Sequence, residues 1–375
     1  MGSKFQVFFL ITTLFLLKEA IDSKETENRT QSHILKYKEV VPGRILQIPE
    51  DHKPHYGYKT EWWYYTGFLE SEIENSSPRE FGVQYTLFKI ELQPLSGIGR
   101  ENEPALLVTH VGIVDMKNQS FQSYTDASRI FPGLAEFTIQ KDGFRMRKRG
   151  STISSEYSVK KNIHEGKIVN SGAEVLHFIV NETSTILLHG KNGFSQKSED
   201  GTASYYYSIP ELEGTASLLW KGQIYKGKIK LWMDREFSSQ FLGKNKTGWD
   251  WVHLELKDGR RIVAFQVRDL SGQKPYTYSM VWDGMKTMHP NVRFTPTRFY
   301  RMKSGRKYPI EWKFRLDQEE FLLQAAVPDC EIGGVLPYWE GPVSVRQEKS
   351  SESSNLEGKG YLEMTGYGDS LPNWL

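Results

Sequence analysis

After about residue 40 the chain is a succession of short segments in which apolar and polar residues alternate, with turn sequences between them. Residues 80–92 read E-F-G-V-Q-Y-T-L-F-K-I-E-L, an alternation of period two that predicts a β-strand. Asp258-Gly259 separates residues 248–257 from residues 261–268, which is the pattern of a β-hairpin. No stretch keeps a helical period for more than two or three turns. The sequence therefore predicts an all-β protein built from sandwiches or barrels.

The N-terminus predicts export from the cell. A short basic start at residues 1–4 is followed by an apolar run of 13 residues at 5–17 and a polar stretch from Lys18. A membrane-spanning helix needs about 20 apolar residues, so this run is typical of a secretory signal peptide. We expect residues 1–23 to be the signal peptide and residues 24–40 to be a polar lead-in. The mature protein is then secreted and extracellular, without a transmembrane segment.

Glycosylation sequons agree with that route. The chain has five N-x-S/T triplets, at Asn28, Asn75, Asn118, Asn181 and Asn245. Together with a signal peptide they predict glycosylation at one or more of these asparagines. Cys330 is the single cysteine, so no internal disulfide can form and core burial has to stabilise the fold. A buried, inert thiol is the more common role for such a residue.

Several function classes are disfavoured by what the sequence lacks. The formal net charge is +2 and no basic block is present, so we expect no nucleic-acid partner. Zinc-protease, paired-cysteine, Walker and dinucleotide motifs are missing, and we expect no metal and no other cofactor. His52 and His55 could hold a metal only with further ligands, and we expect them on a solvent-facing loop. Residues 193–197, G-F-S-Q-K, begin like a nucleophile elbow but end in Lys instead of Gly.

One segment places an acid directly against aromatic residues. Residues 58–70 read Y-K-T-E-W-W-Y-Y-T-G-F-L-E, and on a strand Glu61, Trp63 and Tyr65 share one face. If that face is buried, desolvation raises the pKa of Glu61 and can keep the carboxyl protonated. Alternatively, Glu61 is a partly exposed acid that pairs with a basic neighbour beside an ordinary aromatic core.

A second acid–aromatic segment is L-W-M-D-R-E-F at residues 231–237. On a strand Trp232, Asp234 and Glu236 share one face. Two carboxylates so close repel when both are charged, so one tends to keep its proton near neutral pH. Such a pair can supply a general acid and its conjugate base. The alternative is a salt-bridged exposed face, with Arg235 or a neighbouring lysine as the partner.

Several of these segments carry a family resemblance. The motifs are E-W-W-Y-Y-T-G at 61–67, L-H-G-K-N-G-F-S-Q-K at 188–197, A-S-Y-Y-Y-S-I-P at 203–210, W-M-D-R-E-F at 232–237, G-W-D-W at 248–251, and Y-W-E-G-P-V with G-Y-L-E-M-T-G-Y toward the end. From about residue 40 to residue 368 the chain resembles the AttH-like, or hydroxyneurosporene-synthase-like (carotenoid 1,2-hydratase), proteins. The resemblance implies two lipocalin-like β-barrel domains side by side, here residues 41–230 and 231–375. It also implies water addition to polyenes and isoprenoids or their cyclisation, since related fungal members are pericyclic cyclases.

The resemblance extends to one candidate acid. In the carotenoid hydratases an Asp of the motif corresponding to W-M-D is thought to protonate the terminal alkene, and Asp234 occupies that position. The hydratases place His and Trp where this chain has Tyr205 and Tyr207. This departure puts carotenoid hydration in doubt, although tyrosine rings can still face a carbocation.

Two hypotheses about function remain open at this level. The first is a cofactor-independent enzyme that hydrates, cyclises or isomerises an apolar polyene or terpenoid, with Asp234 as proton donor and Glu236 and Glu61 as its tuning partners. Its ligand would lie against five aromatic side chains: Trp63, Tyr65, Tyr205, Tyr207 and Trp232. The second is a non-catalytic secreted carrier of hydrophobic ligands, or an extracellular-matrix component. Both hypotheses have a hydrophobic small molecule as the partner, and neither specifies an oligomeric state.

Overall fold

The computed structural model describes residues 36–71, 78–92, 105–148, 151–158, 161–240, 242–243, 245–272, 274–334, 337–347 and 357–368. The predicted signal peptide and the sequons at Asn28 and Asn75 lie outside these ranges. Antiparallel strands dominate the described residues, beside a three-residue 3-10 helix, η1 (Glu50–His52). Across the same ranges, no helix is long and apolar enough to cross a bilayer.

The first sheet is a long antiparallel array. Its strands are β1 (Thr60–Ser71), β2 (Arg79–Glu91), β3 (Ala105–Asp115), β4 (Ser120–Arg129), β5 (Ala135–Gln140), β6 (Gly143–Lys148), β7 (Ser151–Ser158), β8 (Lys161–Asn170), β9 (Ala173–Glu182), β10 (Leu187–Leu188), β11 (Phe194–Gln196), β12 (Ala203–Trp220) and β13 (Gln223–Ser238). The order is β4-β3-β2-β1-β13-β12-β9-β8-β7-β6-β5, and the short β10 and β11 pair with β12. β13 is thus held between β1 and β12.

The second sheet takes up the rest of the chain. Its strands are β14 (Lys246–Leu256), β15 (Arg261–Asp269), β16 (Tyr276–Trp282), β17 (Thr287–Met288), β18 (Val292–Arg301), β19 (Lys307–Leu316), β20 (Glu319–Ala325), β21 (Glu331–Ile332), β22 (Tyr338–Gln347) and β23 (Glu357–Met364). β14 and β15 form the predicted hairpin, and Gly259 takes a φ of 94° in its turn, a conformation that favours glycine. The order is β17-β16-β15-β14-β23-β22-β20-β19-β18, with β21 beside β22.

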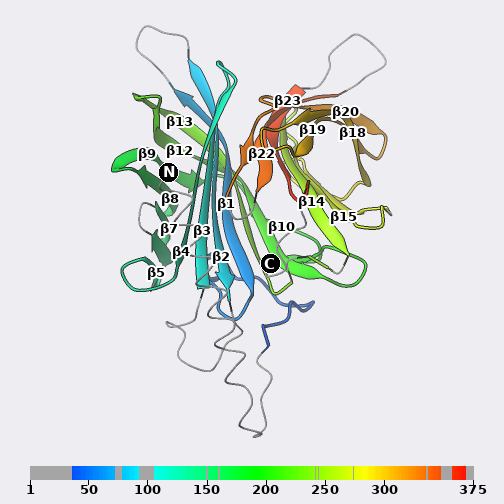
Figure 1. Ribbon diagram of the computed structural model, residues 1–375. Coiled ribbons are helices and arrows are strands. Elements are labelled where there is room, and N and C mark those ends of the chain that lie inside the picture. Colours follow the sequence, from blue (N-terminus) through cyan, green and yellow to red (C-terminus); the bar gives the residue numbers. More distant parts are fainter. Residues whose placement is uncertain are drawn as a thin grey trace, which may run out of the picture. The chain divides into compact units, whose positions relative to one another are not determined.

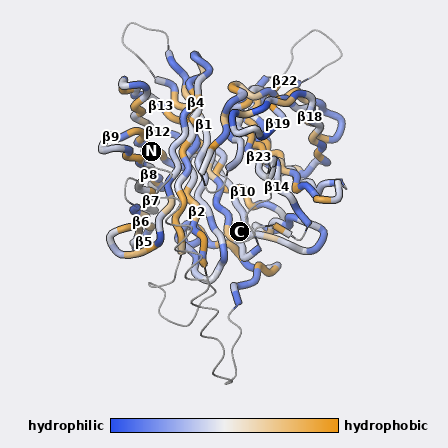
Figure 2. Tube along the Cα trace, in the orientation of Figure 1, coloured by the Kyte–Doolittle hydropathy of each residue, from blue (hydrophilic) through white to orange (hydrophobic). Residues whose placement is uncertain are grey.

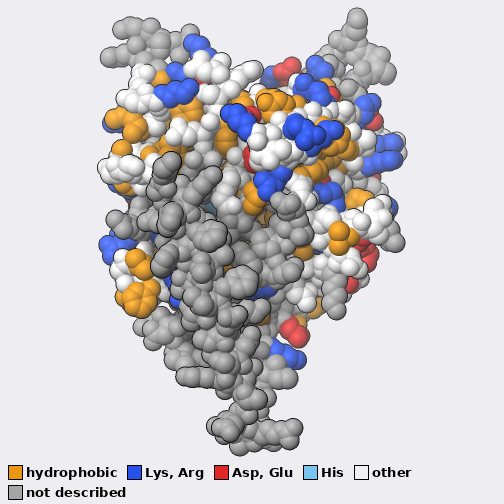
Figure 3. Space-filling model, viewed as in Figure 1, with side chains coloured by type: hydrophobic (Ala, Val, Ile, Leu, Met, Phe, Trp, Pro, Cys, Tyr) orange, Lys and Arg blue, Asp and Glu red, His pale blue; other side chains and the backbone are white. Residues whose placement is uncertain are grey.

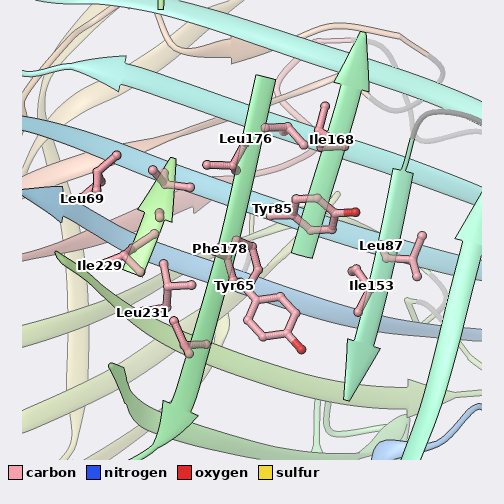
Figure 4. Packing of buried hydrophobic residues seen from close by; sticks show 14 of the residues in the cluster. Tyr65, Leu69, Tyr85, Leu87, Ile153, Ile168, Leu176, Phe178, Ile229 and Leu231 are labelled. Carbon is pink, nitrogen blue, oxygen red and sulfur yellow. The ribbon is translucent and has the colours of Figure 1, made fainter. Parts of the chain in front are cut away.

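Each sheet curves nearly into a barrel around its own hydrophobic core (Figure 1). Inside the first, Tyr65, Tyr85 and Phe178 pack together with aliphatic side chains of neighbouring strands (Figure 4). Hydrophilic and hydrophobic positions interchange along many strands of both sheets (Figure 2). The predicted all-β class with two lipocalin-like barrels is confirmed.

The two sheets belong to one compact unit, Tyr37–Leu375. A third hydrophobic cluster joins them, because it contains Tyr64 and Trp232 from the first sheet and Trp251 and Phe265 from the second. The expected start of the second domain, residue 231, lies within β13, whose strand partners are β1 and β12 of the first sheet. The chain passes to the second sheet between the end of β13 and the start of β14. The division into two domains at residue 231 stays a prediction.

Three residues singled out from the sequence lie at contrasting depths. His52 is 1% exposed, and the prediction of a solvent-facing loop for it is wrong, because its ring packs against Tyr207 inside the first sheet. Cys330 is completely buried, where desolvation raises the pKa of its thiol, and its Sγ donates to the carbonyl of Val327. Asn118, by contrast, is exposed. Lys and Arg side chains are interspersed with apolar and acidic ones over the described part of the face in Figure 3.

Candidate active site between the two sheets

A pocket opens where the first sheet faces the second. Its walls come from β1, β12 and β13 on one side and from β14, β15 and β23 on the other. The rings of Trp62, Tyr206, Trp249, Trp251 and Phe265 line it, together with the carboxyl groups of Asp234, Glu236 and Glu363. The free volume is about 70 Å³, which is room for a few water molecules or one end of a longer ligand.

The alternation of β13 decides which candidates reach this pocket. Asp234 and Glu236 lie on the pocket face, as their spacing predicted, and Arg235 between them points to the opposite face. In the neighbouring strands, Tyr64 of β1 and Ser208 of β12 are the residues directly opposite Asp234. Asp234 therefore sits in the centre of a row of three strands.

Asp234 is 3% exposed and accepts three hydrogen bonds. Its Oδ1 accepts from Ser208 Oγ and from Trp232 Nε1 at 2.6 Å, and its Oδ2 accepts from Tyr206 OH at 2.8 Å. Burial raises the pKa of Asp234 to about 7, with a further contribution from the charge of Glu236, while the three hydrogen bonds oppose this rise. Near neutral pH the carboxyl can thus either hold or release a proton.

Glu236 has a different environment. Its Oε1 lies 3.0 Å from Lys197 Nζ, and the carboxylate is 6% exposed. The ammonium group of Lys197 also lies over the rings of Tyr206 and Phe265, at 4.6 and 4.3 Å from their centroids. A lysine partner, as in the alternative interpretation, is therefore observed for Glu236, although the face that carries the pair is buried and not exposed.

A third carboxyl group reaches the pocket from the second sheet. Glu363 of β23 accepts a hydrogen bond of 2.8 Å from Trp249 Nε1. Desolvation raises the pKa of Glu363 to about 8, and the charges of Asp234 and Glu236 add to this rise. The sequence analysis missed Glu363, because only the placement of β23 against the first sheet brings it to the pocket.

Glu61 lies on the other face of the first sheet and does not meet Asp234. It is 1% exposed and forms ion pairs with Arg235 and, at 3.1 Å, with Lys89. Desolvation alone would raise the pKa of Glu61, but the two cations and a hydrogen bond from His55 outweigh it and hold the pKa well below its usual range. The expected pairing of Glu61 with a basic neighbour is thus observed, although Glu61 is buried and not partly exposed.

Four of the five predicted ligand-binding rings also lie on that opposite face. Trp63 covers the guanidinium of Arg235 at 3.9 Å, and Tyr65 packs in the core of the first sheet (Figure 4). Tyr205 donates to the carbonyl of Val41 at 2.9 Å. Tyr207 bonds His52 Nδ1 at 2.7 Å. None of the five predicted rings, Trp232 included, lines the pocket. Tyr206, the middle tyrosine of the Y-Y-Y run, does so in place of Tyr205 and Tyr207, because successive residues of a strand face opposite ways.

A further acid joins the sheets beside the pocket. Glu340 of β22 is 1% exposed, and Tyr64 OH donates to its Oε1. Desolvation raises the pKa of Glu340 well above its usual value, and the charge of Glu363 acts in the same direction. This environment favours the protonated form of the Glu340 carboxyl group. Among the residues that the structure describes, no group of three or more His, Cys, Asp or Glu side chains is placed to hold a metal ion.

Two barrel-like antiparallel sheets with an acid–aromatic pocket between them define a lipocalin-like two-sheet protein. The chain belongs to the AttH-like family, which matches residues 39–367. The resemblance found in the sequence is thus confirmed.

Solved structures share this fold. A putative AttH protein from Nitrosomonas europaea is 27% identical, with a TM-score of 0.71, and the match covers 88% of this chain and all of that one. Kievitone hydratase from Nectria haematococca is 15% identical (TM-score 0.61, covering 89% and 97%), and CghA with Sch210972 is 11% identical (TM-score 0.53, covering 83% and 89%). A search of the curated proteins finds no significant match.

Proposed function

We propose that the protein is a secreted enzyme that protonates an alkene of an apolar isoprenoid or polyene, leading to hydration or cyclisation. The observation that carries the proposal is Asp234: a buried carboxyl group with a pKa of about 7, unpaired with any cation in the described residues, in a pocket walled by aromatic rings. A general acid works best when its pKa lies near the working pH. The solved hydratase of the same fold makes this chemistry a reasonable first choice.

The proposed reaction begins with transfer of the Asp234 proton to one alkene carbon, which leaves a carbocation on the other. The faces of Trp62 and Trp251 stabilise the cation electrostatically. In hydration, water adds to the cation and the resulting oxonium returns a proton to a pocket carboxylate, giving an alcohol. In cyclisation, a second alkene of the same molecule attacks the cation and a proton is lost to the carboxylate.

The pocket size restricts which part of a ligand can react. A volume of about 70 Å³ is below that of sites that enclose whole drug-sized molecules, about 300–1,000 Å³. The reacting alkene is therefore at the end of a chain, with the remainder held near the entrance. Glu61 and its partner Arg235 have no part in this chemistry, because they lie on the opposite face of the first sheet.

The proposal is tested by incubating the purified protein with a panel of isoprenoid alcohols and polyenes in D₂O. Mass spectrometry should detect addition of water, or deuterium bound to carbon in an isomer of the substrate. Asp234→Asn should lower turnover by ~10²-fold or more, whereas Glu70→Gln, an exposed acid of β1, should leave it unchanged. Binding detected by tryptophan quenching without product from any ligand would favour the carrier instead.

A further inference from the structure

A chain of hydrogen bonds leads away from Asp234 through Oδ1, while Tyr206 donates to the other carboxyl oxygen, Oδ2. Ser208 Oγ bonds Asp234 Oδ1 and also lies 2.6 Å from His189 Nε2. The other ring nitrogen, His189 Nδ1, lies 3.3 Å from the hydroxyl of Tyr278. The chain thus crosses from β13 and β12 of the first sheet to β16 of the second.

The inner members of this chain are buried and its far end is not. Ser208 and His189 are both 0% exposed. Tyr278 is half-buried, and its hydroxyl also accepts from the backbone N–H of Gly190, an exposed residue. The far end therefore lies close to solvent. It is also outside the pocket that a ligand would fill, because neither His189 nor Tyr278 lines that pocket.

We propose that Ser208, His189 and Tyr278 form a proton relay that connects Asp234 with solvent while a ligand occupies the pocket. The inference rests on the proposed role of Asp234 as an acid. Each atom of the relay can exchange its donor and acceptor roles, since hydroxyl groups do both and a neutral imidazole has one nitrogen of each kind.

One transfer moves a single proton from solvent to Asp234. With Asp234 ionised, Ser208 donates to Asp234, His189 Nε2–H donates to Ser208, and Tyr278 donates to His189 Nδ1. Water gives a proton to the Tyr278 oxygen as the tyrosine proton moves to Nδ1, the Nε2 proton moves to Ser208, and the serine proton moves to Asp234. One proton has entered, Asp234 is protonated, and His189 has changed tautomer without becoming charged.

The surroundings of His189 favour such a neutral ring. Burial holds its pKa well below the usual value, and the nearby charges of Lys197 and His289 act in the same direction. The ring of Tyr206 stacks on it at 3.9 Å. At the other end of the relay, Glu236 and Glu363 are the titratable groups near Asp234, and the pKa of Glu363 is raised to about 8.

The relay predicts that the tautomer of His189 follows the ionisation of Asp234. The test is ¹⁵N NMR of the protein labelled at its nine histidines, between pH 5 and 9, with His189 assigned through the His189→Gln variant. In wild type, the Nε2 signal should move from the position of a protonated nitrogen at high pH to that of a bare one at low pH, and the Nδ1 signal should move oppositely. The midpoint should equal that of Asp234, followed by ¹³C NMR of labelled aspartate.

Three variants separate a relay from a structural network. Asp234→Asn and Ser208→Ala should each abolish the tautomer change, and Tyr278→Phe should do so by removing the outer partner. Tyr276→Phe, two residues away on β16, is the matched control and should leave the change intact. A His189 tautomer that stays constant while Asp234 titrates would overturn the relay, as would a ring that becomes charged. Neither outcome depends on turnover, so a failed relay and an absent enzyme activity are told apart.

Discussion

Arg235 and Glu61 form a buried ion pair on the face of the first sheet opposite Asp234, although Arg235 directly follows Asp234 in the sequence. The adjacent residues of β13 thus belong to two separate electrostatic environments. On one face the opposite charges of Glu61 and Arg235 neutralise each other. On the other face the carboxyl group of Asp234 has no cation beside it among the described residues.

Removing the charge of Glu61 should destabilise the fold strongly. Glu61→Gln leaves the guanidinium of Arg235 buried with only neutral partners, and breaking such a buried pair costs about 3–5 kcal/mol. Urea unfolding followed by circular dichroism measures this loss. Glu236→Gln is the matched control, and it should cost about 1–2 kcal/mol, because its partner Lys197 is less buried and keeps its contacts with two rings. Equal losses in the two variants would contradict this account.

Asp234 should make the protein less stable as the pH rises. Its pKa is raised on folding from 3.8 to about 7, so between these values the folded state binds more protons than the unfolded state, and stability falls with increasing pH. At 1.36 kcal/mol for each pKa unit the total fall is at most about 4 kcal/mol. Asp234→Asn should remove this fall, so the variant gains stability relative to wild type from pH 4 to pH 8 in urea titrations. Parallel pH profiles of the two proteins would show that Asp234 is not perturbed.

Glu340 should tolerate a neutral substitute. Because burial of Glu340 favours its protonated carboxyl group, Glu340→Gln should change the unfolding free energy by less than about 1 kcal/mol at pH 7. Glu340→Ala should cost about 2–4 kcal/mol, since it leaves a cavity and deprives Tyr64 OH of its acceptor. Guanidinium unfolding of the two variants supplies the comparison. A glutamine variant as unstable as the alanine variant would indicate an ionised Glu340.

The three described sequons are sterically open to modification. Asn118, Asn181 and Asn245 are all exposed. If the protein is secreted, as we propose, digestion with an amide glycosidase should reduce the mass of the protein from eukaryotic cells. Replacing each asparagine by Gln in turn identifies the sites used. A mass that matches the unmodified chain with Met1 retained would argue against export.

The sequence predicted the fold and half of the candidate site. Alternation placed Asp234 and Glu236 on one face, because the side chains of a strand alternate whatever its neighbours are. It could not show that Tyr206 and not Tyr205 shares that face, since this depends on the register between β12 and β13. The place of Glu363 in the pocket could not be predicted for a different reason. It comes from a strand of the other sheet, and the packing of two sheets leaves no periodic signal in the sequence.

The position of Asp234 within β13 restricts the insertions and deletions that the gene can accept in this strand. A single-codon insertion or deletion between the start of β13 and Asp234, without a compensating bulge, would exchange the two faces of the strand beyond it. Arg235 would then point into the pocket and Asp234 toward Trp63 in the barrel interior. Changes of residue type in this stretch can be accepted one by one, but changes of length cannot. Among homologues, the spacing from the β12–β13 turn to this acid should therefore be fixed even where the intervening residues differ.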